Sequence, residues 1–314
     1  MPLDRHADPL ADRSVGRPAG RPTVLLASCA ALPSGEPGGD LLAAALAERG
    51  VDAAWAVWDD PAVDWVAADL VAVRATWDYH HRAEEFLAWA RRTASATRLL
   101  NGPDVFAWNG DKAYLVPLAA HVPCVPTAPL DGAGPGDPAF DEGLRAALAV
   151  HGTVVVKSRW GAGGVGVVVA DRVDDPRLAD LATGPWLVQP LVESIRTAGE
   201  TSVFVLRSGD GGAPQVVGQV AKVPASGEVR VHEEYGGRST AVPPTAEAAT
   251  TALAAVAAAE ALLGARLDYA RADLVEQGGR LVVGELEVIE PGLYLDVAPA
   301  HAAAFADLVR LALS

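Results

Sequence analysis

Cysteine is scarce in this sequence, and its scarcity excludes a disulfide framework. The two cysteines, Cys29 and Cys124, lie in or beside apolar segments and form no metal-binding pattern. We expect buried free thiols and a reducing, cytoplasmic compartment. Long apolar runs are missing too, because Glu247 and Glu260 interrupt the alanine-rich segment 246–263. The sequence therefore predicts an ordinary helix there and no membrane span.

Positive charge is also in short supply. The formal net charge is −15, which argues against nucleic acid or an anionic membrane as the main partner. Only three of the 25 basic residues are lysines, so arginine supplies nearly all the positive charge. A lysine kept in such a chain is expected where a compact point charge is needed, with chance survival on the surface as the alternative. The three are Lys112, Lys157 and Lys222.

The N-terminal part of the sequence alternates between apolar strands and helices. Residues 1–22 hold no apolar core segment and are expected to be a disordered tail, not a secretory signal. Strands at 23–28, 52–58 and 69–76 alternate with helical segments up to about residue 94. This order predicts a parallel sheet covered by helices.

A polar and aromatic cluster follows the strand at 69–76. Ligands bind beyond the carboxyl ends of parallel strands, and this end combines a cation, a carboxylate, a hydroxyl and two aromatic rings in six residues. The combination suits a small zwitterion. The alternative is a helix N-cap at Asp78 with packed aromatic rings. The candidate substrate residues are Arg74, Thr76, Trp77, Asp78 and Tyr79.

A glycine-rich turn between two valine-rich segments, 154–156 and 167–169, is the most distinctive local pattern. A dinucleotide-binding motif needs a helix after the glycines, and a Walker loop ends in Gly-Lys-Ser/Thr. Protein kinases place their lysine after the glycines, whereas Lys157 precedes them. What remains is a lysine on a strand that enters a flexible hairpin able to hold phosphates, or a plain β-hairpin. Its glycines are Gly161, Gly163, Gly164 and Gly166.

Acidic residues interrupt two apolar strands near the C-terminus, at 268–276 and 280–289. The two-residue period of a strand places Arg271 with Asp273 on one face, and Glu285 with Glu287 on one face of the neighbour. These carboxylates, with Glu290, would repel one another if buried bare. Their hard oxygens favour Mg²⁺, which typically keeps phosphate ligands as well. An exposed edge of alternating acids is the alternative.

Together these features resemble the ATP-grasp superfamily. The resemblance rests on Lys112 at a helix start, Lys157 before the glycines, the apolar strand 189–192 and the Arg-x-Asp and Glu-x-Glu pair. Members such as glutathione synthetase and D-alanine–D-alanine ligase form an acyl phosphate that an amine displaces, with release of ADP and phosphate. The segments most similar to the branch that cyclises O-ureido-D-serine in cycloserine biosynthesis are 74–79, 84–89, 109–115 and 285–291.

The resemblance implies an α/β fold of the ATP-grasp type, with an N-terminal parallel α/β subdomain and two α+β subdomains that clamp ATP. The expected divisions are 23–101 for the substrate subdomain, 102–185 for the central subdomain with a glycine-rich lid, and 186–314 for the C-terminal subdomain with the metal site. The implied activity is ADP-forming ligation of a carboxylate to an amine on a small amino-acid-like substrate, between molecules or by cyclisation. A small-molecule kinase and a non-catalytic nucleotide-binding regulator remain the alternatives, and homodimers are common in the superfamily.

The resemblance also implies roles for individual residues. The residues expected to bind ATP are Lys112, Lys157, Gly161, Gly163, Gly164, Gly166, Gln189, Leu191, Val192 and Glu200. The lysines among them would hold the α- and β-phosphates, and Glu200 the ribose hydroxyls. Mg²⁺, or Mn²⁺ in its place, would be held by Asp273, Glu285 and Glu287.

Three cations are expected to act in catalysis. Arg271 would stabilise charge on the acyl phosphate, while Lys222 and Arg230 would face the γ-phosphate. Many members of the superfamily have asparagine where Glu287 stands, so the extra charge raises the demand for metal; Glu290 adds to it or binds a substrate amino group. Residues 225–245 are expected to form a long polar loop with His232 and Glu234 on its surface.

Overall fold

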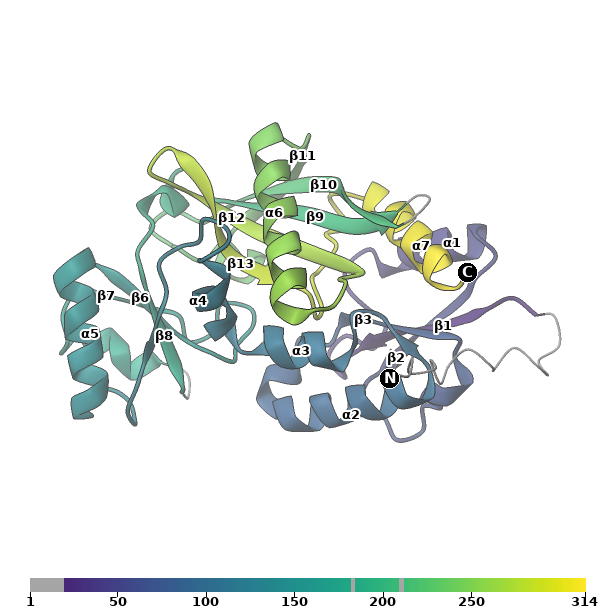
Figure 1. The fold of residues 1–314 in the computed structure, drawn as a ribbon, viewed down its shortest axis with the longest axis horizontal. Helices are drawn as coiled ribbons and strands as arrows, with labels where there is room; N and C mark the ends of the chain where they lie inside the picture. The colour runs from purple at the N-terminus through teal and green to yellow at the C-terminus, as the bar shows by residue number, and fades with distance from the viewer. Residues whose placement is uncertain (1–19, 182–183, 209–211) are drawn as a thin grey trace, which may run out of the picture.

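A computed structural model describes residues 20–181, 184–208 and 212–314, which form three sheets (Figure 1). The expected disordered tail falls mostly on residues 1–19, outside the described residues. The N-terminal sheet is parallel, as the strand–helix alternation predicts, and its strand order is β2-β1-β3-β4. Its strands are β1 (Thr23–Ser28), β2 (Asp52–Val57), β3 (Leu70–Ala75) and β4 (Arg98–Leu99). The helices that pack on it are α1 (Gly39–Glu48) and α2 (Ala83–Ala96).

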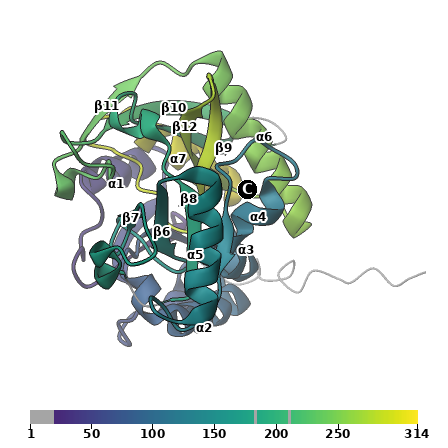
Figure 2. The same cartoon turned by 90° about the vertical axis from the view of Figure 1, so that its left-hand side faces the viewer.

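The central sheet is antiparallel, with the order β5-β8-β6-β7, and α5 (Pro138–His151) covers one of its faces (Figure 2). Its strands are β5 (Ala128–Leu130), β6 (Val154–Ser158), β7 (Val168–Ala170) and β8 (Trp186–Pro190). β6 and β7 form the hairpin expected around the glycines. The sheet extends past the expected division at residue 185, because β8 pairs with both β5 and β6. Its core, built around Phe140, Leu144 and Trp186, is separate from the other apolar clusters.

The C-terminal sheet has five antiparallel strands in the order β11-β10-β9-β12-β13. They are β9 (Glu200–Ser208), β10 (Ala213–Val223), β11 (Arg238–Val242), β12 (Tyr269–Gln277) and β13 (Arg280–Glu287). β11 lies inside the segment 225–245, which was expected to be loop throughout; the polar residues of this edge strand pair with β10. Two helices, α6 (Ala246–Leu263) and α7 (Ala300–Ala312), pack on this sheet (Figure 1).

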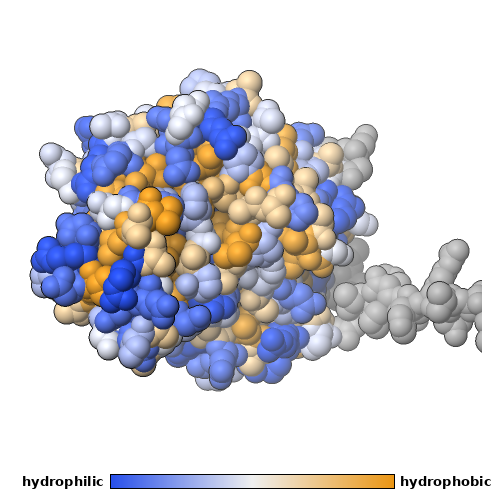
Figure 3. Space-filling view, turned by 60° about the vertical axis from the view of Figure 1, so that its left-hand side comes forward, coloured by the Kyte–Doolittle hydropathy of each residue, from blue (hydrophilic) through white to orange (hydrophobic). Residues whose placement is uncertain are grey.

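Within the described residues, α6 is the single helix long and apolar enough to cross a bilayer. It packs instead on β9, β12 and β13, and it buries alanines such as Ala252, Ala255 and Ala259. On the face that Figure 3 shows, apolar side chains lie in patches between hydrophilic ones. Cys29 is buried and Cys124 half-buried, and both are free thiols as expected.

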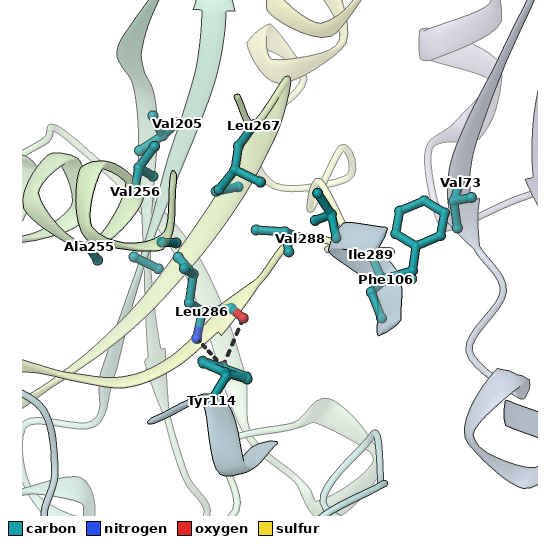
Figure 4. Packing of buried hydrophobic residues seen from close by; sticks show 14 of the residues in the cluster. Val73, Phe106, Tyr114, Val205, Ala255, Val256, Leu267, Leu286, Val288 and Ile289 are labelled. Atoms are coloured by element: carbon teal, nitrogen blue, oxygen red, sulfur yellow. Dashed lines mark hydrogen bonds between the residues drawn. The ribbon is translucent and has the colours of Figure 1, made fainter. Parts of the chain in front are cut away.

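Short helices connect the N-terminal sheet to the other two. They are α3 (Gly102–Gly110), a 3-10 turn (Lys112–Tyr114) and α4 (Leu115–Leu118). The sequence indicated turns over 101–110, where α3 lies, and a helix over 111–121, where the 3-10 turn and α4 lie. Tyr114 Oη donates to the carbonyl of Leu286 and accepts from its amide (Figure 4). Asn109 bonds in the same way to the backbone of β13 and the residue after it, Val288. At the start of α3, Asn101 Nδ2 donates to the carbonyls of Tyr269 and Val288.

The remaining short elements are 3-10 helices that border the strands. Tyr79–Arg82 follows β3, and Glu233–Tyr235 precedes β11. The others are Trp65–Ala67, Pro176–Asp180 and Glu193–Arg196. One apolar cluster lies between the parallel sheet, α3, α6 and the five-stranded sheet. Phe106, Val73 and Ile289 pack in it (Figure 4).

Candidate active site

The acidic residues of β12 and β13 face one another across two paired strands. Asp273 stands opposite Glu285, and Arg271 stands opposite Glu287. The register shifts immediately after Asp273, which leaves Gly284 as an extra, unpaired residue on β13. Such a bulge bends a strand and re-aims its side chains. The two strands thus bring together the charged residues that the two-residue period placed on common faces.

Arg271 holds two of these acids. Its Nε and Nη2 atoms lie 2.9 and 2.8 Å from the two carboxylate oxygens of Asp273, and Nη2 also bonds to Glu287. Both members of the bidentate pair are buried. Burial alone would raise the pKa of Asp273, but the charges of Arg271 and Lys222 hold it well below its usual range. Asp273 is therefore ionised at neutral pH.

Two of the lysines meet at Glu285. Lys112 forms an ion pair with Glu285. Burial alone would lower the lysine pKa, but the charge and hydrogen bond of Glu285, with the charges of Glu287 and Glu290, raise it. Burial lowers the pKa of Lys157, although Glu285 is again the nearest compensating charge. The backbone fixes their proximity, since the amide of Lys112 donates to the carbonyl of Arg159, two residues after Lys157. Arg159 in turn pairs with Asp111.

The third lysine is paired differently from the expectation. Lys222 and Glu200 are cross-strand partners on β10 and β9, and the lysine Nζ lies 2.5 Å from a Glu200 oxygen. The sequence-based roles would separate them, with one at the γ-phosphate and the other at the ribose. Lys222 is 1% exposed, and Asp273 and Glu200 raise its pKa above the ordinary value although burial acts against its charge. In this structure Lys222 is the shared cationic partner of two carboxylates, those of Glu200 and Asp273.

The glycine segment between β6 and β7 needs backbone conformations that side chains disfavour. Gly163 and Gly164 have φ of 62° and 70°, in the left-handed region. Gly164 also approaches the loop before β11: a Cβ there would lie 3.2 Å from His232 Nδ1 and 3.3 Å from Arg230 Cδ. Arg230 itself pairs with Glu228 and stacks on Tyr235, whose ring centroid lies 3.6 Å from its Cζ.

The expected adenine-binding segment follows β8. Gln189 does not point freely into solvent, since its Nε2 donates to Thr127 Oγ1 at 2.8 Å. Leu191 and Val192 are half-buried and pack against the apolar cluster that includes Val275. They present an apolar surface between the central and C-terminal sheets.

Arg74 does not lie where a substrate could reach it. Its side chain is 0% exposed, and its Nη2 bonds to Glu36 and, at 2.5 Å, to the carbonyl of Pro291. Its guanidinium also stacks over the ring of Phe305. The expectation of a direct substrate contact is wrong in this structure, because Glu36 and the carbonyl of Pro291 hold the guanidinium inside the protein. Arg74 instead fixes the segment that follows Glu290.

The rest of the 74–79 cluster divides between packing and the site. Asp78 accepts from Trp58 Nε1 and pairs with Arg82, so its carboxylate is already bound within the N-terminal subdomain. Thr76 and Tyr79 are buried. Trp77 Nε1 donates to the carbonyl of Glu290 at 3.2 Å, and so links this cluster to the acidic segment.

Glu290 is the acid left without a cation. It is 8% exposed, and among the described residues no basic side chain forms an ion pair with it. Burial, and then the charge of Glu287, raises its pKa well above the ordinary value. Burial likewise raises the pKa of Glu287 to about 7 even though Arg271 opposes the shift. A further positive charge in the site would therefore stabilise the ionised forms of Glu287 and Glu290.

Sequence reasoning missed two aromatic residues of the site. Tyr294 has a positive φ of 53°, and its ring centroid lies 5.5 Å from Lys222 Nζ and 5.6 Å from Arg271 Cζ. A non-glycine residue in this conformation often marks a functional position. His232 was expected at the surface, but its Nδ1 is buried. Neither position has a local sequence signal, because each is defined by contacts with distant strands.

The acids have the donor chemistry of a magnesium site but are not arranged as a ready cage. Asp273, Glu285 and Glu287 are hard oxygen donors on adjoining strands, yet each is paired with Arg271 or Lys112. Throughout the described part of the chain, no group of three or more His, Cys, Asp or Glu residues is disposed to hold a metal. Mg²⁺ commonly takes only one or two protein carboxylates plus substrate phosphates. The residues fit that mode of binding.

Comparison with known proteins agrees with this arrangement. Residues 24–101 match the family model of the D-cycloserine synthetase DcsG N-terminal domain. The chain is 31% identical over 268 residues to the cycloserine biosynthesis protein DcsG of Streptomyces lavendulae, covering 82% of this chain and 87% of that protein. The chain belongs to the DcsG family.

Solved structures extend the DcsG relationship. The crystal structure of D-cycloserine synthetase DcsG superposes with a TM-score of 0.78 at 29% identity, over 93% of this chain and 100% of that one. The ATP-grasp ligase PsnB, solved with Mg and ADP, superposes with a TM-score of 0.61 at 15% identity, over 94% and 99%, which shows the shared fold. This member of the DcsG family is thus an ATP-grasp ligase that forms C–N bonds, as the resemblance implied.

Proposed function

We propose that the chain is an ADP-forming ligase that activates the carboxylate of a small D-amino-acid derivative, with cyclisation of O-ureido-D-serine to D-cycloserine as the first candidate reaction. The observation that carries the substrate class is Glu290. A buried carboxyl group with no cationic partner, beside further acids, favours a ligand with an ammonium group. An amino acid provides that group together with the carboxylate to be activated.

The reaction would proceed in two transfers. A carboxylate oxygen of the substrate attacks the γ-phosphorus of ATP, the bond to the β-phosphate oxygen breaks, and ADP leaves. The amine nitrogen then attacks the acyl carbon and loses its proton, the bond to phosphate breaks, and inorganic phosphate leaves with the electron pair. In O-ureido-D-serine the attacking nitrogen is the one bonded to the side-chain oxygen, and D-cycloserine forms once water has removed its carbamoyl group as carbon dioxide and ammonia. Arg271, fixed by Asp273 and Glu287, is suited to stabilise the negative charge that develops on the acyl oxygen.

The cations of the site would position the nucleotide. Lys157 and Lys112 lie together at the base of the glycine segment, where their charges suit the α- and β-phosphates. In the proposed complex Lys112 exchanges Glu285 for phosphate, which frees that carboxylate. Asp273, Glu285 and Glu287 would then hold Mg²⁺, which when bound neutralises phosphate charge. The glycine segment, with Gly163 and Gly164 in left-handed conformations, would close over the phosphates.

The decisive experiment incubates the purified protein with ATP, Mg²⁺ and a panel of amino acids. The panel contains O-ureido-D-serine, its L-enantiomer, D-alanine and D-serine, and ADP, phosphate and the organic product are each quantified. We expect O-ureido-D-serine to give ADP and phosphate in equal amounts together with D-cycloserine. Hydroxylamine should divert the acyl phosphate to a hydroxamate.

Two controls separate the parts of the proposal. Glu290→Gln should raise KM for the amino acid while leaving KM for ATP nearly unchanged, because it removes only the proposed ammonium partner. A substrate that accumulates as a stable phosphorylated product, with no phosphate release, would identify a kinase instead. Absence of ADP formation with every amino acid would remove the substrate class proposed here.

A further inference from the structure

His232 is fixed by its backbone but not by its side chain. Its carbonyl accepts from the amides of Tyr235 and Gly237, which anchors the turn before β11. The ring lies inward: Nδ1 is buried and, among the described residues, bonds to no other group. Buried polar atoms almost always have a hydrogen-bond partner, so an unpaired one beside charged groups is a candidate to bond a ligand.

The ring lies against the glycine segment that precedes β7. Its Nδ1 is 3.2 Å from the position that a Cβ on Gly164 would take, and Arg230 Cδ is 3.3 Å from the same position. Gly164 belongs to the hairpin of the central sheet, whereas His232 belongs to the C-terminal sheet's connection. The two segments, which belong to different sheets, are therefore in contact, and the charges of Lys222, Arg271 and Asp273 act on the ring.

The charges around His232 favour an anion. Burial, together with the positive charges of Lys222 and Arg271, lowers the pKa of His232 to about 4. The imidazole is therefore neutral at pH 7, with one N–H to donate. A donor beside Lys222, Arg230 and Arg271 is suited to a phosphate oxygen, and the glycine segment is the element that covers phosphates.

We propose that His232 Nδ1–H donates a hydrogen bond to the terminal phosphate of ATP, as a binding contact that ADP does not make. The inference rests on the nucleotide half of the proposed function and is independent of the amino acid substrate. The contact would complete a ring of donors around the transferred phosphoryl group, contributed from both sheets. It would also favour the closed position of the glycine segment when ATP, and not ADP, is bound.

The test compares the affinities of the wild type and variants for AMP-PNP and ADP with Mg²⁺ by isothermal titration calorimetry. His232→Ala should weaken AMP-PNP by about tenfold or more, the usual effect of losing a hydrogen bond to a charged group, and leave ADP within about twofold. His232→Asn keeps a donor near the position of Nδ1 and should retain most of the affinity. His232→Gln places its amide farther out, near Nε2, and should behave like alanine. His121→Ala, at an exposed histidine, is the matched control.

The outcomes are distinguishable from failure of the ligase proposal, because no amino acid is present. Selective loss of AMP-PNP affinity in the alanine and glutamine variants, with rescue by asparagine, supports the contact. Equal weakening of both nucleotides would assign His232 a structural role in the loop and overturn the inference. Unchanged AMP-PNP affinity in His232→Ala would overturn it as well. Thermal unfolding of each variant without nucleotide identifies any that fail to fold.

Discussion

Lys222 and Glu200 face each other across β9 and β10, with Nζ 2.5 Å from the carboxylate, and the same Nζ lies 3.6 Å from Asp273. The lysine is almost completely buried between them. One cation thus connects an acid expected at the ribose with an acid expected at the metal. If the proposed nucleotide complex forms, a ligand at either of these acids would change the charge balance at the other.

The first prediction concerns this pair. Glu200→Gln keeps the shape of the side chain but leaves Lys222 with Asp273 alone, and we expect a loss of about 2 kcal/mol in the free energy of unfolding. Urea denaturation without nucleotide measures it. The control is Glu193→Gln, because Glu193 pairs with Arg196 on the surface and should contribute about 0.5 kcal/mol or less. Equal losses in both variants would show that the buried pair stabilises the fold no more than the surface pair does.

The second prediction concerns the opposed acids of β12 and β13. Asp273→Asn and Glu285→Gln should each lower kcat by about 100-fold or more. Asp273 fixes Arg271, Glu285 pairs with Lys112, and both carboxylates are proposed ligands of the nucleotide's metal. Circular dichroism should show a folded protein in both cases. Glu142→Gln, at an exposed residue of α5, is the matched control. Near-normal turnover in either site variant would remove that carboxylate from the catalytic machinery.

The third prediction compares two neighbouring glycines. Gly163→Ala and Gly164→Ala both place alanine at a positive φ, so both pay about 1 kcal/mol of backbone strain. A Cβ at 163 meets nothing within 4 Å, whereas at 164 it crowds His232 and Arg230. We therefore expect KM for ATP to rise by about tenfold in Gly164→Ala, and much less in Gly163→Ala. Identical KM values would mean that the contact with His232 is unimportant for closure.

The fourth prediction concerns pH. The pKa of His232 is lowered to about 4 in the folded chain, below its unfolded value of 6.5, so its contribution to stability is complete above pH 6.5 and is lost as pH falls through 4. His232→Asn has no titrating group at this position. From pH 7 to pH 4 the wild type should therefore lose about 3 kcal/mol more unfolding free energy than the variant. If the unfolding free energies of wild type and variant, measured with urea, change equally with pH across this range, His232 is not buried as a neutral ring.

Much of this fold was predictable from local patterns. The parallel sheet follows from the strand–helix alternation, and the hairpin around Gly163 from valines on both sides of the glycines. The two-residue period placed Arg271 with Asp273, although only the register of β12 against β13 shows that Asp273 stands opposite Glu285. The family resemblance supplied the rest of the ligase prediction, because no single motif identifies the activity.

The missed features depend on contacts between distant segments. Arg74 has the residue type of a substrate contact, but Glu36 and the carbonyl of Pro291 bind it inside the protein. β8 joins the central sheet because Trp186–Pro190 pairs with β6, which composition does not reveal. His232 lies in a polar segment that reads as surface, and the glycine segment covers it. In each case a residue more than 30 positions away decides the outcome.

Asn101, Asn109 and Tyr114 give the molecule a mechanical division. Their side chains fasten the helical connection after the parallel sheet to the backbone of β12, β13 and the residues that follow. The N-terminal and C-terminal sheets consequently behave as one frame. The central sheet has its own core and no such fastening by these three residues. We therefore expect the central sheet, β5 to β8, to be the part that moves when nucleotide enters and ADP leaves, while the acids of β12 and β13 stay in place.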